Sequence, residues 1–247
     1  MISTKPWSIE AVARLFLGVI VTYCGGMFLA GLLQTMKLGM APARLLFLQM
    51  IILVVFFQGA ALIWIAKFLR ESNISWRAAF GLRPSSRVVA VAIGLAVGVM
   101  VLPVMWLLQM LSEAVMTLLN FNPVAQVAVT ELQNGAVPVP EKILLAAFTV
   151  LLAPVAEEAL FRGILYPTIK QSGRPRWALW GSSILFGVLH QNMAIFVPLV
   201  FLAVLLVLLY ESSGSLLTTI ATHSMFNAAN VFYLFFPDPI NRLLHFS

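Results

Sequence analysis

Charged residues are scarce in this chain of 247 residues: they make up 10% of it, whereas hydrophobic residues make up 61%. Soluble domains carry about 25% charged residues and roughly 45–50% apolar ones, so this composition excludes a soluble globular domain. The apolar residues form long runs without period-two alternation, which excludes a membrane β-barrel. A bilayer core about 30 Å thick needs around 20 apolar residues per helix. The composition therefore predicts an all-α, polytopic membrane helix bundle.

Cysteine is also nearly absent, since Cys24 is the only one. A single cysteine allows no intramolecular disulfide, and its place in the first apolar run predicts a small, packed side chain. The chain has no HExxH motif, the zinc signature that places two histidines one helical turn apart. The net charge of +6 does not indicate a nucleic-acid partner, because the bases lie in short loops between apolar runs, where membrane topology explains them.

The apolar runs predict a single integral membrane domain, residues 1–247, with about seven transmembrane helices. The fifth and sixth runs are joined by only HQNMA, so we expect a tight helical hairpin with one member barely long enough to cross. The predicted spans are residues 11–35, 44–66, 88–112, 143–169, 177–192, 194–210 and 215–236.

The loops predict an orientation, because cytoplasmic loops of membrane proteins are enriched in lysine and arginine. With the N-terminus inside, nine bases face the cytoplasm and four face outside, which favours a cytoplasmic N-terminus and an external C-terminus. The cytoplasmic loop 67–87 mixes bases with Trp76 and Phe80, which suits a helix at the headgroups with its aromatic side chains in the interface, but a plain connector between spans is the favoured alternative. The external segment 120–141, broken by glycine and prolines, predicts an irregular loop.

Three charged residues lie inside the fourth apolar run: Glu157, Glu158 and Arg162. A charge at the centre of a span costs about 2.5–3.5 kcal/mol on insertion scales, so each one needs a partner or a function. Glu158 and Arg162 are four residues apart and share a helical face, which predicts a structural ion pair. Glu157 is rotated by about 100° from Glu158, so this pair does not neutralise it.

Two of the three histidines lie in later spans. His190 is in the fifth, and His223 is in the seventh together with Asn227, which shares its face four residues later. Helical rise places Glu157, His190 and His223 roughly 20, 20 and 14 Å from the cytoplasmic ends of their helices. The similar depth predicts a shared site within the membrane.

Two mechanisms are open for such a site. In the metal-free one, a carboxylate and an imidazole hold and deprotonate water, while an asparagine amide and a second imidazole donate to the oxyanion that forms when this water attacks a carbonyl. In the other, Glu157, His190 and His223 are three ligands of a zinc ion, and water takes the fourth position. The metal-free mechanism is favoured, because a metal would occupy the groups needed as base and donors.

At these residues the sequence resembles the CPBP or Abi family, which contains intramembrane CAAX prenyl proteases and bacterial bacteriocin-processing relatives. The family pattern is EExxxR, FxxxH and HxxxN on successive core helices. Here EEALFR begins at Glu157, FGVLH runs from Phe186 to His190, and HSMFN runs from His223 to Asn227. The resemblance covers roughly residues 140–236, the expected catalytic core, and residues 1–120 are expected to form scaffold helices.

The resemblance implies that Glu157 activates water with His190, and that His223 and Asn227 stabilise the oxyanion. It also implies that Glu158 and Arg162 support the site and that Phe186 shapes the pocket. The expected activity is hydrolysis of a peptide bond in a membrane-associated protein or peptide, in a bacterial plasma membrane and among membrane lipid.

Two other functions stay open from the sequence. The first is a non-catalytic membrane protein that binds a peptide or toxin in the same cavity, as bacteriocin immunity requires. The second is a transporter, which is disfavoured because the central charges are concentrated in spans four, five and seven instead of two repeated halves.

Overall fold

A computed structural model describes residues 5–36, 39–82, 87–121 and 137–235, and this part of the chain is built from helices. Within these residues, seven helical segments and one short helix follow each other. The single helices are α1 (Ile9–Thr35), the short α4 (Trp76–Phe80), α5 (Arg87–Leu118), α10 (Pro175–Leu189), α11 (Met193–Ser213) and α12 (Leu216–Phe235). Between α1 and α4, one continuous segment consists of α2 (Pro42–Val54), η1 (Val55–Gly59) and α3 (Ala60–Glu71). Between α5 and α10, a second continuous segment consists of α7 (Val139–Ala147), η3 (Phe148–Leu152), α8 (Ala153–Glu158), η4 (Ala159–Leu165) and α9 (Tyr166–Gln171).

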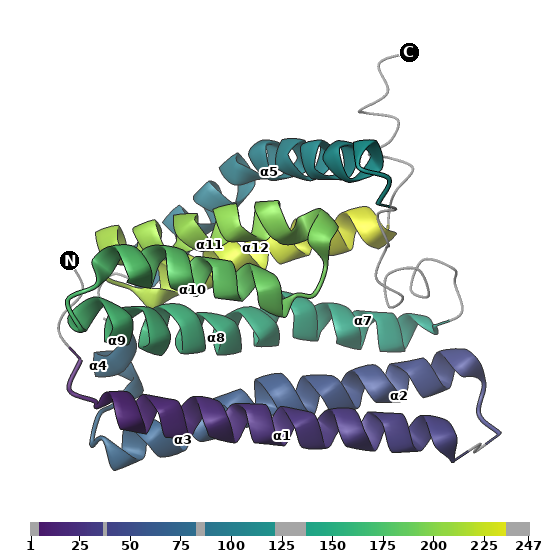
Figure 1. Cartoon of the computed structure of the whole chain (residues 1–247), viewed down its shortest axis with the longest axis horizontal. Helices are drawn as coiled ribbons and strands as arrows, with labels where there is room; N and C mark the ends of the chain where they lie inside the picture. Colours follow the sequence, from purple (N-terminus) through teal and green to yellow (C-terminus); the bar gives the residue numbers. More distant parts are fainter. Residues whose placement is uncertain (1–4, 37–38, 83–86, 122–136, 236–247) are drawn as a thin grey trace.

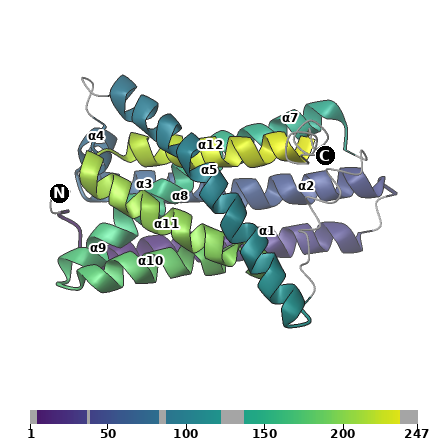
Figure 2. The ribbon, with the colours of Figure 1, turned by 90° about the horizontal axis from the view of Figure 1, so that it is seen from above.

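The helices form a bundle in which successive segments run in opposite directions (Figure 1). The α1 helix and the α2–α3 segment lie together on one side, and the α7–α9 segment lies between them and α10, α11 and α12. The α5 helix crosses α11 and α12 obliquely, as Figure 2 shows. The start of α1 and the end of α12 lie at opposite ends of the bundle.

The predicted class, a polytopic membrane helix bundle, is confirmed. Within the described residues, α1, α2–α3, α5, α7–α9 and α11 are long and apolar enough to cross a membrane. The α10 helix has 15 residues and is about 22 Å long, short of the roughly 30 Å of a bilayer core. It is the short member of the predicted hairpin. The scaffold and core division at residues 120 and 140 stays a prediction, and most of the predicted external loop, residues 122–136, lies outside the described residues.

The central α7–α9 segment is widened by two π-helical stretches, η3 and η4, on either side of α8. Pro154, near the start of α8, has no backbone N–H to offer the carbonyl four residues earlier, which a regular α-helix requires. A π-helical turn adjusts to this because it shifts the hydrogen bonding by one residue. The change in backbone hydrogen bonding is local, but it occurs in the turn directly before Glu157 and Glu158.

Close packing between α5 and α12 depends on two glycines of α5 that are four residues apart and form a GxxxG motif. A Cβ at Gly94 would overlap the carbonyl oxygen of Thr218, and a Cβ at Gly98 would lie 2.6 Å from Cβ of Met225. The hydroxyl of Thr222 donates to the carbonyl of Gly94 at 2.9 Å. The absence of side chains at both glycines therefore lets the two backbones approach and fixes the position of α12.

One local prediction is wrong, and the helix considered for loop 67–87 is present but has only one of its two aromatic residues exposed. Cys24 is exposed instead of packed, on an α1 surface that faces away from the bundle. In α4, Trp76 is exposed but Phe80 is buried, and its ring occupies the space that a side chain at residue 163 would fill. The absence of a side chain at Gly163 therefore leaves room for the Phe80 ring in the core. Of these two aromatic residues, only Trp76 is exposed.

Candidate functional site

The site is organised around a buried ion pair in the central segment. Glu158, at the end of α8, is fully buried, and Arg162, in η4, is 1% exposed. Nη1 of Arg162 donates to Oε1 of Glu158 at 2.8 Å. The guanidinium also lies 4.6 Å from the ring centroid of Phe186, and its Nη2 lies 3.4 Å from the carbonyl oxygen of Ala203. The predicted contact between Glu158 and Arg162 is therefore present.

His223, on α12, contacts the same carboxylate. Its Nδ1 lies 2.9 Å from Oε1 of Glu158, and the histidine is 2% exposed. A carboxylate held by Arg162 is an acceptor, so Nδ1 carries the proton and donates. Glu158 thus fixes the ring of His223 in one orientation.

The second ring nitrogen of His223 faces Glu157. Nε2 lies 3.9 Å from Oε2 of Glu157, whose side chain is 12% exposed. This distance is too long for a direct hydrogen bond, but a single water molecule can lie about 2.8 Å from both atoms. Glu157 and His223 therefore form a pair of groups that can share one water.

His190 caps the C-terminus of α10 instead of lying within the helix. Its Nδ1 lies 2.8 Å from the carbonyl oxygen of Phe186. Because a carbonyl only accepts, Nδ1 is the donor and Nε2 is the acceptor of the neutral ring. The ring of Phe186 lies 4.8 Å from that of His190 and 5.7 Å from that of His223, measured between centroids, so Phe186 contacts both imidazoles.

Asn227 lies one turn after His223 on α12. Its Nδ2 donates to the carbonyl oxygen of Thr149, in η3, at 2.9 Å. This bond uses one of its two amide protons and leaves the other available to a ligand.

The structure brings some of the predicted residues into contact and leaves others apart. Glu157, Glu158, Arg162 and His223 form one connected group, and Phe186 links it to His190. Among the described residues, no hydrogen bond or ion pair joins His190 to Glu157. The same part of the chain contains no group of three histidine, cysteine or acidic side chains that could hold a metal ion, so Glu157, His190 and His223 do not fit the zinc alternative as they lie.

Sequence reasoning missed two contacts of this site. Glu158 was expected to pair with Arg162 alone, but it also orients His223, 65 residues away. Thr149 gave no signal at all, because it contributes a backbone carbonyl, which every residue has. The π-helical stretch that contains Thr149 follows from Pro154, which was the one available clue.

Comparison with known proteins supports the resemblance seen in the motifs. Residues 139–229 match the family described as type II CAAX prenyl endopeptidase Rce1-like. The matched segment begins with α7 and ends within α12, so it contains the whole candidate site. The predicted likeness to the CPBP or Abi family is confirmed over this segment, and it supports an intramembrane endopeptidase of the CAAX type in general. No curated protein and no solved structure gives a match to the chain.

Proposed function

We propose that this membrane protein is an endopeptidase of the CAAX type in which Glu157 activates water to hydrolyse a peptide bond in a membrane-associated protein or peptide. The observation that carries the proposal is the 3.9 Å separation between the Glu157 carboxylate and Nε2 of His223, while Glu158 holds the other nitrogen of the ring. A base and an imidazole in this arrangement have the geometry that water activation requires.

Water bound between these groups would begin the reaction. Glu157 takes one proton as the water oxygen attacks the carbonyl carbon of the scissile bond, and the carbonyl oxygen becomes an oxyanion. The C–N bond then breaks, and Glu157 gives its proton to the leaving nitrogen. The products are a carboxylic acid and an amine, and the carboxylate of Glu157 is restored.

The other site residues stabilise and orient these steps. Asn227 has an amide proton left for the oxyanion, and His223 donates to it from Nε2 when both ring nitrogens carry protons. In that state the positive charges of Arg162 and His223 balance the negative charges of Glu158 and the oxyanion, because Glu157 then carries the proton taken from the water. The family resemblance implies that His190 assists Glu157, and the bond from its Nδ1 to the carbonyl of Phe186 leaves Nε2 as the free acceptor of the ring.

Glu158 and Arg162 are positioning residues in this proposal. Neither needs to contact the substrate, because Glu158 acts through the ring of His223 and Arg162 holds Glu158. The burial of both supports the role, since charged hydrogen bonds are stronger and more directional away from water.

No step is assigned to a metal ion. The zinc alternative needs Glu157, His190 and His223 around one point, and the described residues contain no group of three such side chains that could hold a metal ion. Metal dependence is therefore put to a chelation test in the Discussion.

The proposed setting is a bacterial plasma membrane, with the N-terminus in the cytoplasm and the C-terminus outside. The excess of lysine and arginine at the end of the bundle that contains α4 supports this orientation. The opposite ends at which α1 begins and α12 finishes are compatible with it.

The experiment that tests the activity uses the purified protein in lipid vesicles, with a peptide pool presented in prenylated and unprenylated forms. New peptide termini are identified by mass spectrometry, and heat-inactivated protein is the control. We expect discrete new termini with the native protein alone. A folded protein that retains peptides on the vesicles but creates no termini would contradict the proposal and favour the non-catalytic binding or immunity function.

A further inference from the structure

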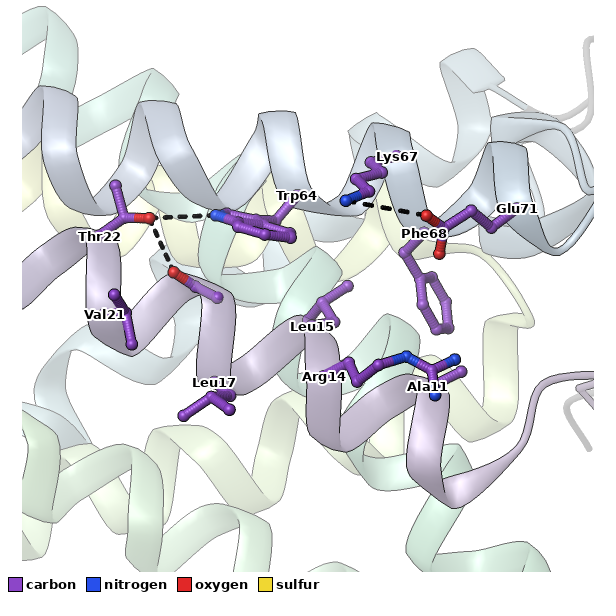
Figure 3. A pocket seen from close by; sticks show the side chains of 11 residues that line it. Ala11, Arg14, Leu15, Leu17, Val21, Thr22, Trp64, Lys67, Phe68 and Glu71 are labelled. Carbon is purple, nitrogen blue, oxygen red and sulfur yellow. Dashed lines mark hydrogen bonds and ion pairs between the residues drawn. The ribbon is translucent and has the colours of Figure 1, made fainter.

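A groove between α1 and α3 lies outside the site described above. It has a volume of about 430 Å³, within the range of roughly 300–1,000 Å³ typical of ligand pockets. Figure 3 shows its side chains, which come from α1 and α3, whereas the site residues come from α8, η4, α10 and α12. The lining residues are Ala11, Arg14, Leu15, Leu17, Gly18, Val21, Thr22, Trp64, Lys67, Phe68 and Glu71.

The apolar end of the groove has a fixed shape. The indole Nε1 of Trp64 donates to the hydroxyl of Thr22 at 3.1 Å, and this hydroxyl donates to the carbonyl oxygen of Gly18 at 2.7 Å. A Cβ at residue 18 would lie 2.6 Å from the Trp64 ring, so the glycine allows the ring to lie against α1. The tryptophan is therefore held in place by one hydrogen bond, to a hydroxyl that is itself fixed, and by one close approach.

The opposite end of the groove is charged (Figure 3). Lys67 lies 3.9 Å from Glu71 and 4.9 Å from the ring centroid of Trp64, and both members of this ion pair are 58% exposed. Arg14 is exposed and has no ion pair among the described residues. Two cations therefore face one anion, and the guanidinium of Arg14 is left for an anionic ligand.

The two ends lie at different depths in a membrane. Arg14 is five residues from the start of α1, about 8 Å along the helix, and Glu71 is the last residue of α3. Thr22 is about 20 Å from the same end. Leu17 and Val21, between them, are each 61% exposed and face the lipid. The charged end is thus at headgroup depth, and the apolar end reaches the hydrocarbon.

We propose that this groove binds one anionic glycerophospholipid. Its phosphate contacts Arg14 and Lys67, and one acyl chain lies along Leu17, Val21 and Trp64. Basic pockets between transmembrane helices are suited to anionic headgroups, and an acyl chain fills an apolar space that water does not. The proposal does not depend on the peptidase activity, because the residues that line the groove take no part in the candidate site.

The test measures lipid binding to the purified full-length protein in neutral detergent by native mass spectrometry. Phosphatidylglycerol and phosphatidylcholine with identical acyl chains are titrated in parallel. We expect one phosphatidylglycerol to bind more tightly than phosphatidylcholine. Arg14→Gln and Lys67→Gln should each weaken it roughly 5-fold, since a base near the headgroups contributes about 1 kcal/mol.

Arg70→Gln is the matched control, because Arg70 is exposed on α3 three residues from Lys67 but does not line the groove. A second variant, Val21→Trp, fills the apolar end and should reduce binding of the lipid while leaving the melting temperature in lipid-free detergent unchanged.

Four results would overturn the proposal. Equal weakening by Arg70→Gln would indicate diffuse surface attraction, and equal binding of phosphatidylcholine would remove the role of the headgroup charge. Competition by glycerol 3-phosphate at the same concentration would show that the chain is not held. Displacement of phosphatidylglycerol by a prenylated peptide would assign the groove to a peptide substrate, if the Val21→Trp variant no longer binds that peptide.

Discussion

The imidazole of His223 meets the carboxylate of Glu158 at 2.9 Å, although the two residues are 65 positions apart in the chain. The same oxygen atom accepts from Arg162 at 2.8 Å. Because one buried carboxylate holds both partners, its charge links the stability of the bundle to the orientation of a site histidine.

Replacing Glu158 with glutamine should destabilise the protein strongly. Glutamine keeps an acceptor oxygen but leaves the buried charge of Arg162 uncompensated, and breaking a buried pair in this way costs about 3–5 kcal/mol. The matched control is Lys67→Gln, which breaks an exposed pair of the same i, i+4 spacing and should cost less than about 1 kcal/mol. Thermal unfolding in one detergent compares them, and similar melting temperatures for the two variants would argue against a role for the buried charge.

The packing of α5 on α12 predicts opposite effects of the same substitution at two glycines. Gly94→Ala places a methyl group against the backbone oxygen of Thr218 and should cost about 1–3 kcal/mol. Gly25→Ala, in α1, has nothing within 4 Å of the added methyl group and should be neutral or stabilising by up to about 1 kcal/mol. Chemical or thermal unfolding measures the stability of both variants. An unchanged stability in Gly94→Ala would show that α5 and α12 can move apart without destabilising the protein.

Chelation should leave peptide cleavage unchanged. The mechanism proposed above uses Glu157 and His223 for water and assigns no step to a metal ion. The measurement is the initial cleavage rate after dialysis against a zinc chelator, compared with a sample to which zinc is returned. Loss of the rate on chelation, with recovery on adding zinc, would establish the zinc mechanism instead.

The proposed orientation predicts which side of the membrane each end of the bundle faces. Ala41, before α2, and Ala78, in α4, are both exposed and lie at opposite ends. In a Cys24→Ser background, Ala41→Cys should react with a membrane-impermeant maleimide on intact cells, and Ala78→Cys only after permeabilisation. The reverse pattern would place the N-terminus outside.

Much of the fold was predictable because bilayer thickness and helical rise fix the length of a crossing segment. Each predicted span coincides with a helical segment of the structure, and the short fifth span is α10. The contact between Glu158 and Arg162 was predictable for a similar reason, since a spacing of four residues determines a shared helical face.

The remaining features depend on tertiary packing. Whether Glu157 or Glu158 meets His223 is decided by the local rotation of α8, which the π-helical stretches on both sides alter. The burial of Phe80 depends on space beside Gly163, in a segment more than 80 residues later. The position of His190 depends on where α10 ends, and helix ends are the least certain part of a sequence-based prediction.

The most direct test of the central claim, that Glu157 activates water, is the cleavage rate of Glu157→Gln on a peptide that the wild type cleaves. Glutamine keeps the shape of the side chain but cannot take a proton from water. Glu113→Gln is the matched control, because it removes a carboxylate of α5 that is bonded to Gln109 and not to a residue of the site. We expect kcat/KM to fall at least about 100-fold in Glu157→Gln and to stay near the wild-type value in Glu113→Gln. A folded Glu157→Gln protein that cleaves at the wild-type rate would contradict the account.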